Sequence, residues 1–115
     1  MLPKLNRLKK KKDFDRVFKE GKRFKEDCLI FTVAKNNFKN SRFGFIVSKA
    51  VSKKTTLRNK IKRRLRELVR TKITKIKKGF NVVLIAKAGL ENKDFWEIEE
   101  TLNKLLNRAK IIENV

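Results

Sequence analysis

The stretch KKTTLRNKIKRRLRELVR, residues 53–70, carries nine Lys or Arg side chains and a single carboxylate. At 100° per residue, its apolar side chains fall on one stripe of a helix and most of its cations lie on the opposite arc. The alternative is a solvated lysine-rich helix, but such helices usually intersperse acids at i,i+4 spacing, which reduces self-repulsion. The stretch therefore predicts an amphipathic helix with an anion-binding face. Its apolar stripe consists of Leu57, Ile61, Leu65 and Leu68.

The composition points to one domain with a polyanionic partner. The chain has 115 residues, 40% of them hydrophobic, and a formal net charge of +21. A field of this sign favours nucleic acid, and an anionic membrane surface is the competing target. No apolar run approaches the ~20 residues that a spanning helix needs, and the N-terminus lacks an apolar signal core. We therefore expect a soluble, cytoplasmic protein that is monomeric when free, and the lone Cys28 fits a reducing compartment.

The charge is unevenly distributed along the chain. Residues 1–90 hold 29 Lys or Arg and six Asp or Glu, whereas residues 91–115 hold four and six. The C-terminal segment is therefore expected to be scaffold. We expect residues 1–115 to form a single RNA-binding domain, with residues 1–12 as a mobile basic arm.

The apolar pattern predicts an alternation of helices and strands. Asp13 can cap a short helix that Gly21 ends in a left-handed conformation, and the helical spacing of Phe14 and Phe18 favours a core role for both. Period-two and continuous apolar runs predict strands, and Asp94 can cap a final helix. The three predicted strands span residues 28–35, 42–48 and 80–86, which yields the order α, β, β, α, β, α.

Side chains suited to catalysis are scarce. The chain has no His, and its only Cys lies in an apolar run. Glu97 and Glu100 could bind Mg²⁺, but solvated helix charge explains them better. We therefore predict no catalytic group and no metal site on this polypeptide. Arg58, Arg63 and Arg66, by contrast, would track a sugar-phosphate backbone, because each guanidinium can grip phosphate oxygens in pairs.

Three blocks resemble the protein subunit of bacterial ribonuclease P. They are DFDRVFKEG at residues 13–21, RFGFIVSK at 42–49 and RNKIKRRLRE at 58–67, and they occur in the family's order and spacing. The resemblance implies an α+β fold of order α-β-β-(β)-α-β-α. It further implies a four-stranded mixed sheet, three helices, a left-handed β-α-β crossover and a ribosomal-protein-like two-layer sandwich. A separate RNA subunit would remove the 5′ leader from precursor tRNA with Mg²⁺ bound mainly by RNA.

The resemblance also assigns roles to individual residues. By resemblance, the residues expected to bind the catalytic RNA are Arg58, Asn59, Lys60, Lys62, Arg63 and Arg66. Lys53 and Lys54 are added to this set for their charge. Those expected to bind the leader are Phe14, Phe18, Phe31, Ser48 and Lys49. Lys60 stands where the family usually has Arg and Phe31 where it often has Tyr. This assignment replaces the core role that spacing favours for Phe14 and Phe18.

Two other functions are compatible with the charge alone. One is a ribosomal or other structural RNA-binding protein, and the other is a stand-alone nuclease that uses the acidic C-terminal helix. The missing catalytic side chains argue against the nuclease, and the three ordered blocks favour the ribonuclease P subunit over both.

Overall fold

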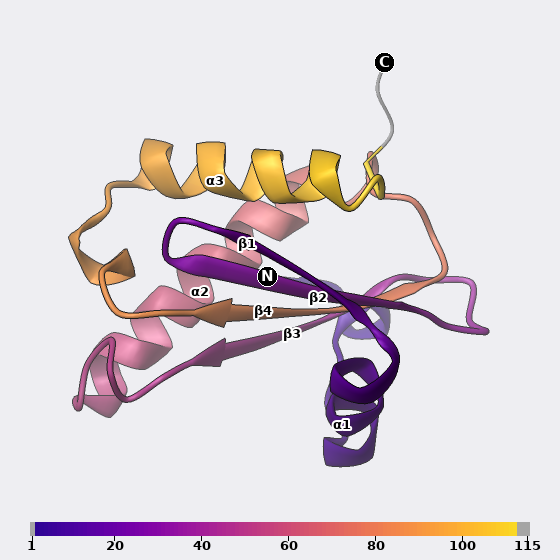
Figure 1. Ribbon diagram of the computed structural model, residues 1–115, viewed down its shortest axis with the longest axis horizontal. Coiled ribbons are helices and arrows are strands. Elements are labelled where there is room, and N and C mark those ends of the chain that lie inside the picture. The colour runs from indigo at the N-terminus through magenta and orange to yellow at the C-terminus, as the bar shows by residue number, and fades with distance from the viewer. Residues whose placement is uncertain (1, 113–115) are drawn as a thin grey trace.

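The computed structural model describes residues 2–112, which form one α+β domain (Figure 1). The order of helices and strands confirms the expected α-β-β-β-α-β-α arrangement. The elements, including two short 3₁₀ helices η1 and η2, are η1 Lys4–Asn6, α1 Lys11–Glu20, β1 Lys22–Glu26, β2 Leu29–Lys35, β3 Arg42–Val47, α2 Thr55–Lys72, β4 Phe80–Ala86, η2 Leu90–Asn92 and α3 Phe95–Arg108.

The four strands form a mixed sheet in the order β1-β2-β4-β3. β1 pairs with β2 and β2 with β4 in antiparallel fashion, whereas β3 and β4 are parallel and are joined through α2. α2 lies behind the sheet in Figure 1, so the path from β3 through α2 to β4 turns in the left-handed sense. This is the crossover that the family resemblance implied, against the usual right-handed rule.

Apolar periodicity located only three of the four strands. The missing one, β1, has the sequence KRFKE and pairs with β2 from Lys22 opposite Val33 to Glu26 opposite Leu29. Because four of its five side chains are charged, the strand has no alternating apolar pattern by which it could be predicted. The charged side chains suit its position at the sheet edge, because charge on an edge strand discourages pairing with another chain.

The main core lies between the sheet and the helices α2 and α3. Every second residue of the central strands points to this face, as the pleat requires. The predicted stripe of α2 is buried except for Leu57, which is half-exposed, and Val69 joins it. The largest fully buried side chains of this core are Leu2, Leu29, Phe31, Phe43, Leu65, Leu68, Leu84, Leu102, Leu105, Leu106 and Ile111.

Helix α1 covers part of the opposite face of the sheet. Val17 of α1 packs with Leu8 and Val83 in a second, smaller apolar cluster, and Phe14 lies against it. The two-layer description therefore applies to the sheet with α2 and α3, and α1 adds a partial layer on the other side (Figure 1).

Residues 2–8 are packed against the sheet, so the prediction of a mobile arm over residues 1–12 is wrong for them. Leu2 has no exposed surface and belongs to the main core, while Leu8 belongs to the smaller cluster. Between them Arg7 pairs with Phe43 at the edge of β3, and the Leu8 N–H donates to the Phe43 carbonyl at 2.9 Å. Two isolated leucines among cations form no periodic pattern, so nothing in the sequence indicated that each is buried. The N-terminal segment thus crosses the sheet edge from one face to the other.

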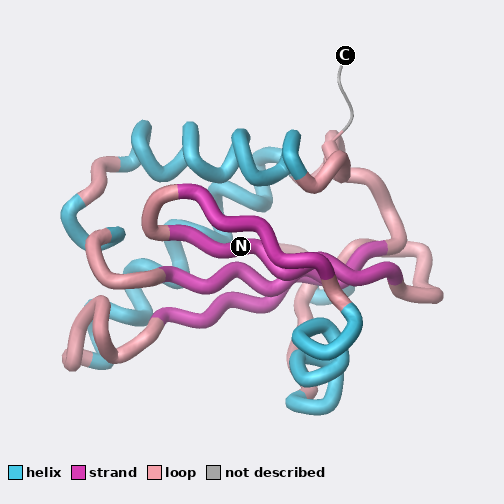
Figure 2. Tube along the Cα trace, in the orientation of Figure 1, coloured by secondary structure: helices cyan, strands magenta, loops and turns pink. Residues whose placement is uncertain are grey.

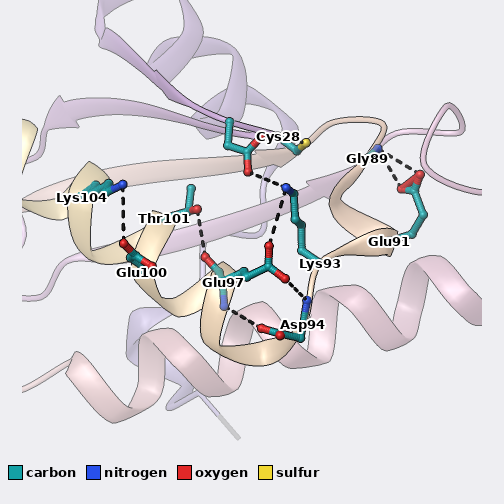
Figure 3. Close-up of polar contacts among 10 residues, drawn as sticks. Cys28, Gly89, Glu91, Lys93, Asp94, Glu97, Glu100, Thr101 and Lys104 are labelled. Atoms are coloured by element: carbon teal, nitrogen blue, oxygen red, sulfur yellow. Dashed lines mark hydrogen bonds and ion pairs between the residues drawn. The ribbon is translucent and has the colours of Figure 1, made fainter.

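The predicted helix caps were correct only at α3. The Asp94 carboxylate accepts from the Glu97 N–H at 2.9 Å, and the Glu97 carboxylate accepts from the Asp94 N–H, which forms a capping box (Figure 3). α1 begins at Lys11, so Asp13 lies in its first turn and caps nothing. Gly21 ends α1 with φ −83°, which is not left-handed. A Cβ there would lie 2.5 Å from the Val17 carbonyl oxygen, so close packing requires this glycine.

Cys28 lies in the turn before β2, half-buried, and not within the strand. Partial burial and a contact with the Asp27 carboxylate raise the pKa of its thiol. The neighbouring Lys93 ammonium lies 3.3 Å from Asp27 and 3.7 Å from Glu97, and these contacts join the β1–β2 turn to the start of α3 (Figure 3). Among residues 2–112, no helix is long and apolar enough to cross a membrane.

Candidate nucleic-acid interface

The exposed face of α2 carries the cations that the sequence assigned to RNA binding. Lys53, Lys54, Asn59, Lys60 and Arg63 are exposed at the start of α2 and along it. Within the described part of the chain, none of the eight predicted RNA-binding residues forms an ion pair with a carboxylate, and the α2 acid Glu67 pairs with Arg70 at 3.0 Å. The positive charge of this face is therefore available to a polyanion.

Arg58 is partly engaged within the protein. Its guanidinium donates to the Ser52 carbonyl at 2.9 Å and to the Thr55 hydroxyl at 3.2 Å. These bonds tie the loop before α2 to the first turn of the helix. Because Arg has five N–H donors, others remain to meet a phosphate from the half-buried position of Arg58.

Lys62 and Arg66, one turn apart on α2, lie beside an aromatic ring of α1. Both line a hollow of about 210 Å³ with Phe14 and Gly44, at the β3 edge of the sheet. We call it the Phe14 hollow. The N-terminal segment contributes Arg7 and Lys9 to its rim. The hollow therefore combines an apolar ring with four cations, which suits a nucleotide of single-stranded RNA.

Gly44 allows Phe14 to lie against the sheet. A Cβ at this position would overlap the Cε1 and Cζ atoms of the Phe14 ring. The sequence indicated a close approach at this strand glycine, and the structure identifies Phe14 as the approaching group.

Replacing Gly44 with alanine is expected to lower the free energy of unfolding by about 1–3 kcal/mol, because the added methyl group overpacks against the Phe14 ring. Urea unfolding measures this change. In a Phe14→Ala background the same substitution should cost little, since the overlap is gone. An equal loss in both backgrounds would show that the ring is not the cause.

The other predicted leader-binding aromatics differ sharply in exposure. Phe18 lies on α1 with 44% of its surface exposed, so its ring can meet a base. Phe31 is 0% exposed, within the main core. The prediction of a leader-binding role for Phe31 is wrong in this structure, because strand alternation points Phe31 toward α2 and α3 whereas α1 covers the other face. No part of its ring is accessible to RNA.

Ser48 and Lys49 follow the end of β3, where the loop to α2 begins. Ser48 is half-buried and its N–H donates to the Ala86 carbonyl at 3.4 Å, while Lys49 is exposed. Neither residue lines the Phe14 hollow. The structure thus brings Phe14 together with Lys62 and Arg66, and it leaves Ser48 and Lys49 outside that hollow.

Lys60 faces a different groove from Lys62 and Arg66. It lines a groove of about 200 Å³ with Arg64, Leu57 and Leu90, between α2 and η2. Arg64 is not among the predicted RNA-binding residues, although its i,i+4 spacing from Lys60 places the two cations on one side of the helix. The basic face of α2 is therefore divided into two flanks.

The described residues contain no group of three or more His, Cys, Asp or Glu side chains that could hold a metal ion. The Mg²⁺ that the family resemblance implies therefore has no matching set of protein ligands within residues 2–112. What the site offers instead is phosphate-binding cations and exposed rings. This arrangement can bind and position RNA.

Comparison with known proteins shows what this chain is similar to. The family model described as Ribonuclease P matches residues 2–110. The "Ribonuclease P protein component" of Clostridium botulinum strain 657 is 38% identical over 109 residues, covering 94% of this chain and 97% of the relative. That of Fusobacterium nucleatum is 35% identical over 112 residues, covering 94% and 100%.

Solved structures agree with the sequence relatives. The RNase P protein of Staphylococcus aureus superposes with a TM-score of 0.86 at 28% identity, covering 94% of this chain and 98% of that one. The RNase P protein of Thermotoga maritima superposes with a TM-score of 0.80 at 38% identity, covering 89% and 96%.

Proposed function

The chain belongs to the bacterial ribonuclease P protein family, whose members are subunits of an endoribonuclease, and from this premise we propose how it binds its RNAs. The exposed face of α2 binds the catalytic RNA subunit. The Phe14 hollow and the exposed ring of Phe18 on α1 bind the single-stranded 5′ leader of precursor tRNA. The protein thereby assists removal of the leader and release of the mature 5′ end.

The observation that carries this proposal is the Phe14 hollow. Lys62 and Arg66 reach it from α2 and Phe14 reaches it from α1, so one surface holds both kinds of group that single-stranded RNA requires. α2 would then bind the RNA subunit on its exposed face and the leader on the side that carries Lys62 and Arg66. The two RNAs would then meet along α2.

The chemistry of leader removal is assigned to the RNA subunit. The chain has no His, and residues 2–112 offer no cluster of metal ligands, so its side chains bind and orient RNA. The RNA subunit would hold most of the Mg²⁺, which would there supply the chemistry that activates water for hydrolysis. The protein lowers the Mg²⁺ requirement because its own cations offset phosphate repulsion.

The ribosomal alternative rests on charge alone, and no feature of the fold favours it over the family match over residues 2–110. We place the protein in the cytoplasm, where precursor tRNA is processed, and we expect it to be monomeric before it meets RNA. Immunoprecipitated RNA dominated by ribosomal RNA would reverse this preference.

Phe18→Ala tests the leader contact. We expect it to weaken binding of precursor tRNA to the reconstituted holoenzyme by about five-fold, because loss of one base–aromatic stack costs at least ~1 kcal/mol. Binding of mature tRNA, which has no leader, should not change. Dissociation constants for both RNAs measure the difference.

The matched control is Phe95→Ala, which removes a ring that is also 44% exposed but lies at the start of α3. It should leave both affinities unchanged. Equal losses for precursor and mature tRNA in Phe18→Ala would contradict a leader contact at this ring.

A further inference from the structure

A second cationic hollow lies on the N-terminal side of the Phe14 hollow. It has a volume of about 400 Å³ and lies between the N-terminal segment and the β2–β3 loop. We call it the arm–loop hollow. Its six cations are Lys4, Arg7, Lys9, Lys10, Lys12 and Arg42. The only carboxylate in its lining is that of Asp13, so the hollow is suited to a polyanion.

Phe38 supplies an aromatic ring at this hollow. The ring is 58% exposed, the most exposed phenylalanine among the described residues. The Arg42 guanidinium lies 4.3 Å from the centre of the ring, which leaves the other face open. The Phe38 backbone N–H donates to the Asn36 side-chain oxygen at 2.8 Å, and this bond shapes the loop around the ring.

Arg42 is itself held in place beneath the ring. Its Nε donates to the Asn81 side-chain oxygen at 3.1 Å, and its Nη1 lies 3.8 Å from the Asp13 carboxylate. Asn36 donates to the same Asn81 oxygen at 2.8 Å. The network joins the loop, β3, β4 and α1, so the exposed ring is presented by a pre-organised platform. A pre-organised group loses less conformational freedom on binding.

The arm–loop hollow continues from the Phe14 hollow. Arg7 and Lys9 line both, so a strand leaving one meets the same cations in the next. Arg42 begins β3 and Ser48 follows its end, which separates them by about 20 Å along the strand at ~3.3 Å per residue. Figure 2 shows the β2–β3 loop and the β3–α2 loop at opposite ends of the sheet.

We propose that the arm–loop hollow binds the 5′-distal nucleotides of a long precursor leader, with one base stacked on the open face of Phe38. The phosphates of this segment lie among the cations of the N-terminal segment. This inference rests on leader binding at the Phe14 hollow and extends the leader path beyond it. A short leader ends before it reaches Phe38.

The test compares precursor tRNAs with leaders of about four and about twelve nucleotides, a span that covers typical single-strand site sizes. Each is titrated with holoenzyme carrying wild-type protein, Phe38→Leu or Phe38→Trp. Leucine keeps an apolar side chain but removes the stacking face, and tryptophan restores it. Phe95→Leu is the matched control on another exposed ring, and unfolding midpoints check that each variant folds.

Phe38→Leu is expected to weaken binding of the long-leader precursor by about five-fold, with no change for the short leader or for mature tRNA. Phe38→Trp should restore wild-type affinity. Unchanged affinity for the long leader would overturn the inference, and so would an equal loss for all three RNAs, which would place Phe38 against the RNA subunit. After either of these outcomes, the proposed function would still stand if the wild-type holoenzyme bound the short-leader precursor more tightly than mature tRNA.

Discussion

Replacing Lys62 and Arg66 together with glutamine is expected to weaken binding of the catalytic RNA and of precursor tRNA by at least about ten-fold near physiological salt. In the proposed interface each side chain would neutralise one phosphate, and each lost contact should lower the slope of log affinity against log salt by about 0.7–0.9 units. The double variant should therefore flatten that slope by about 1.5 units. Both residues line the Phe14 hollow, so the loss should be larger for precursor than for mature tRNA.

Filter-binding or fluorescence titrations at several salt concentrations measure the affinity and the slope together. The control is Lys104→Gln with Lys110→Gln, which removes the same charge on and after α3, the helix that contacts β1 at the sheet edge opposite β3. Because that charge is distant from the proposed interface, its effect should be small. Equal slopes for both double variants would mean that net charge, not the α2 face, governs binding.

Phe31→Ala is expected to lower the free energy of unfolding by about 3–5 kcal/mol, because it leaves a large cavity between the sheet and the α2–α3 layer. Such a loss is a large fraction of the stability of a domain of this size, typically 5–15 kcal/mol. Urea denaturation followed by circular dichroism measures it. Any loss of RNA binding should follow from the unfolded fraction.

Phe18→Ala is the comparison for this prediction, since 44% of the Phe18 surface is exposed on α1. It should change stability by less than about 1 kcal/mol and act mainly on the leader. If Phe31→Ala remained as stable as wild type but lost precursor affinity, Phe31 would be a leader contact after all, and the core assignment would be wrong.

The parts of the fold that the sequence predicted well are those with strong apolar periodicity. α2, β4 and α3 each bury a clear stripe or run, and Asp94 caps α3 as expected. The parts that escaped prediction carry no such apolar pattern. β1 is charged and becomes a strand only through pairing with β2, and the N-terminal segment is fixed by single leucines at positions 2 and 8.

The kinds of residue in the candidate site were predictable from the sequence, but their arrangement in space was not. The basic face of α2 follows from helical periodicity, whereas the leader-binding role of Phe14 came from family resemblance. Spacing alone favoured a core role, which is partly right because Phe14 packs on Gly44. The ring also lines an open hollow, and its leader-binding role stays a prediction. Resemblance alone also selected Phe31, which strand alternation directs into the core.

The division of the α2 cations into two flanks required the structure. Helical spacing separates Lys60 and Arg64 from Lys62 and Arg66 by direction, but it does not reveal what lies opposite each flank. η2 lies across from the first pair, and α1 with the N-terminal segment across from the second. The arm–loop hollow was equally hidden, because it joins residues 4–12 to the β2–β3 loop.

We expect this chain to contribute RNA binding and to leave the chemistry to the RNA subunit. The most direct test measures precursor-tRNA cleavage by the RNA subunit at low Mg²⁺, with and without the protein. We predict strong stimulation by wild-type protein and much weaker stimulation by the Lys62→Gln, Arg66→Gln variant. Cleavage by the RNA subunit without protein should become faster when Mg²⁺ is raised. Cleavage at low Mg²⁺ that is no faster with wild-type protein than without it would show that this chain does not assist the RNA subunit.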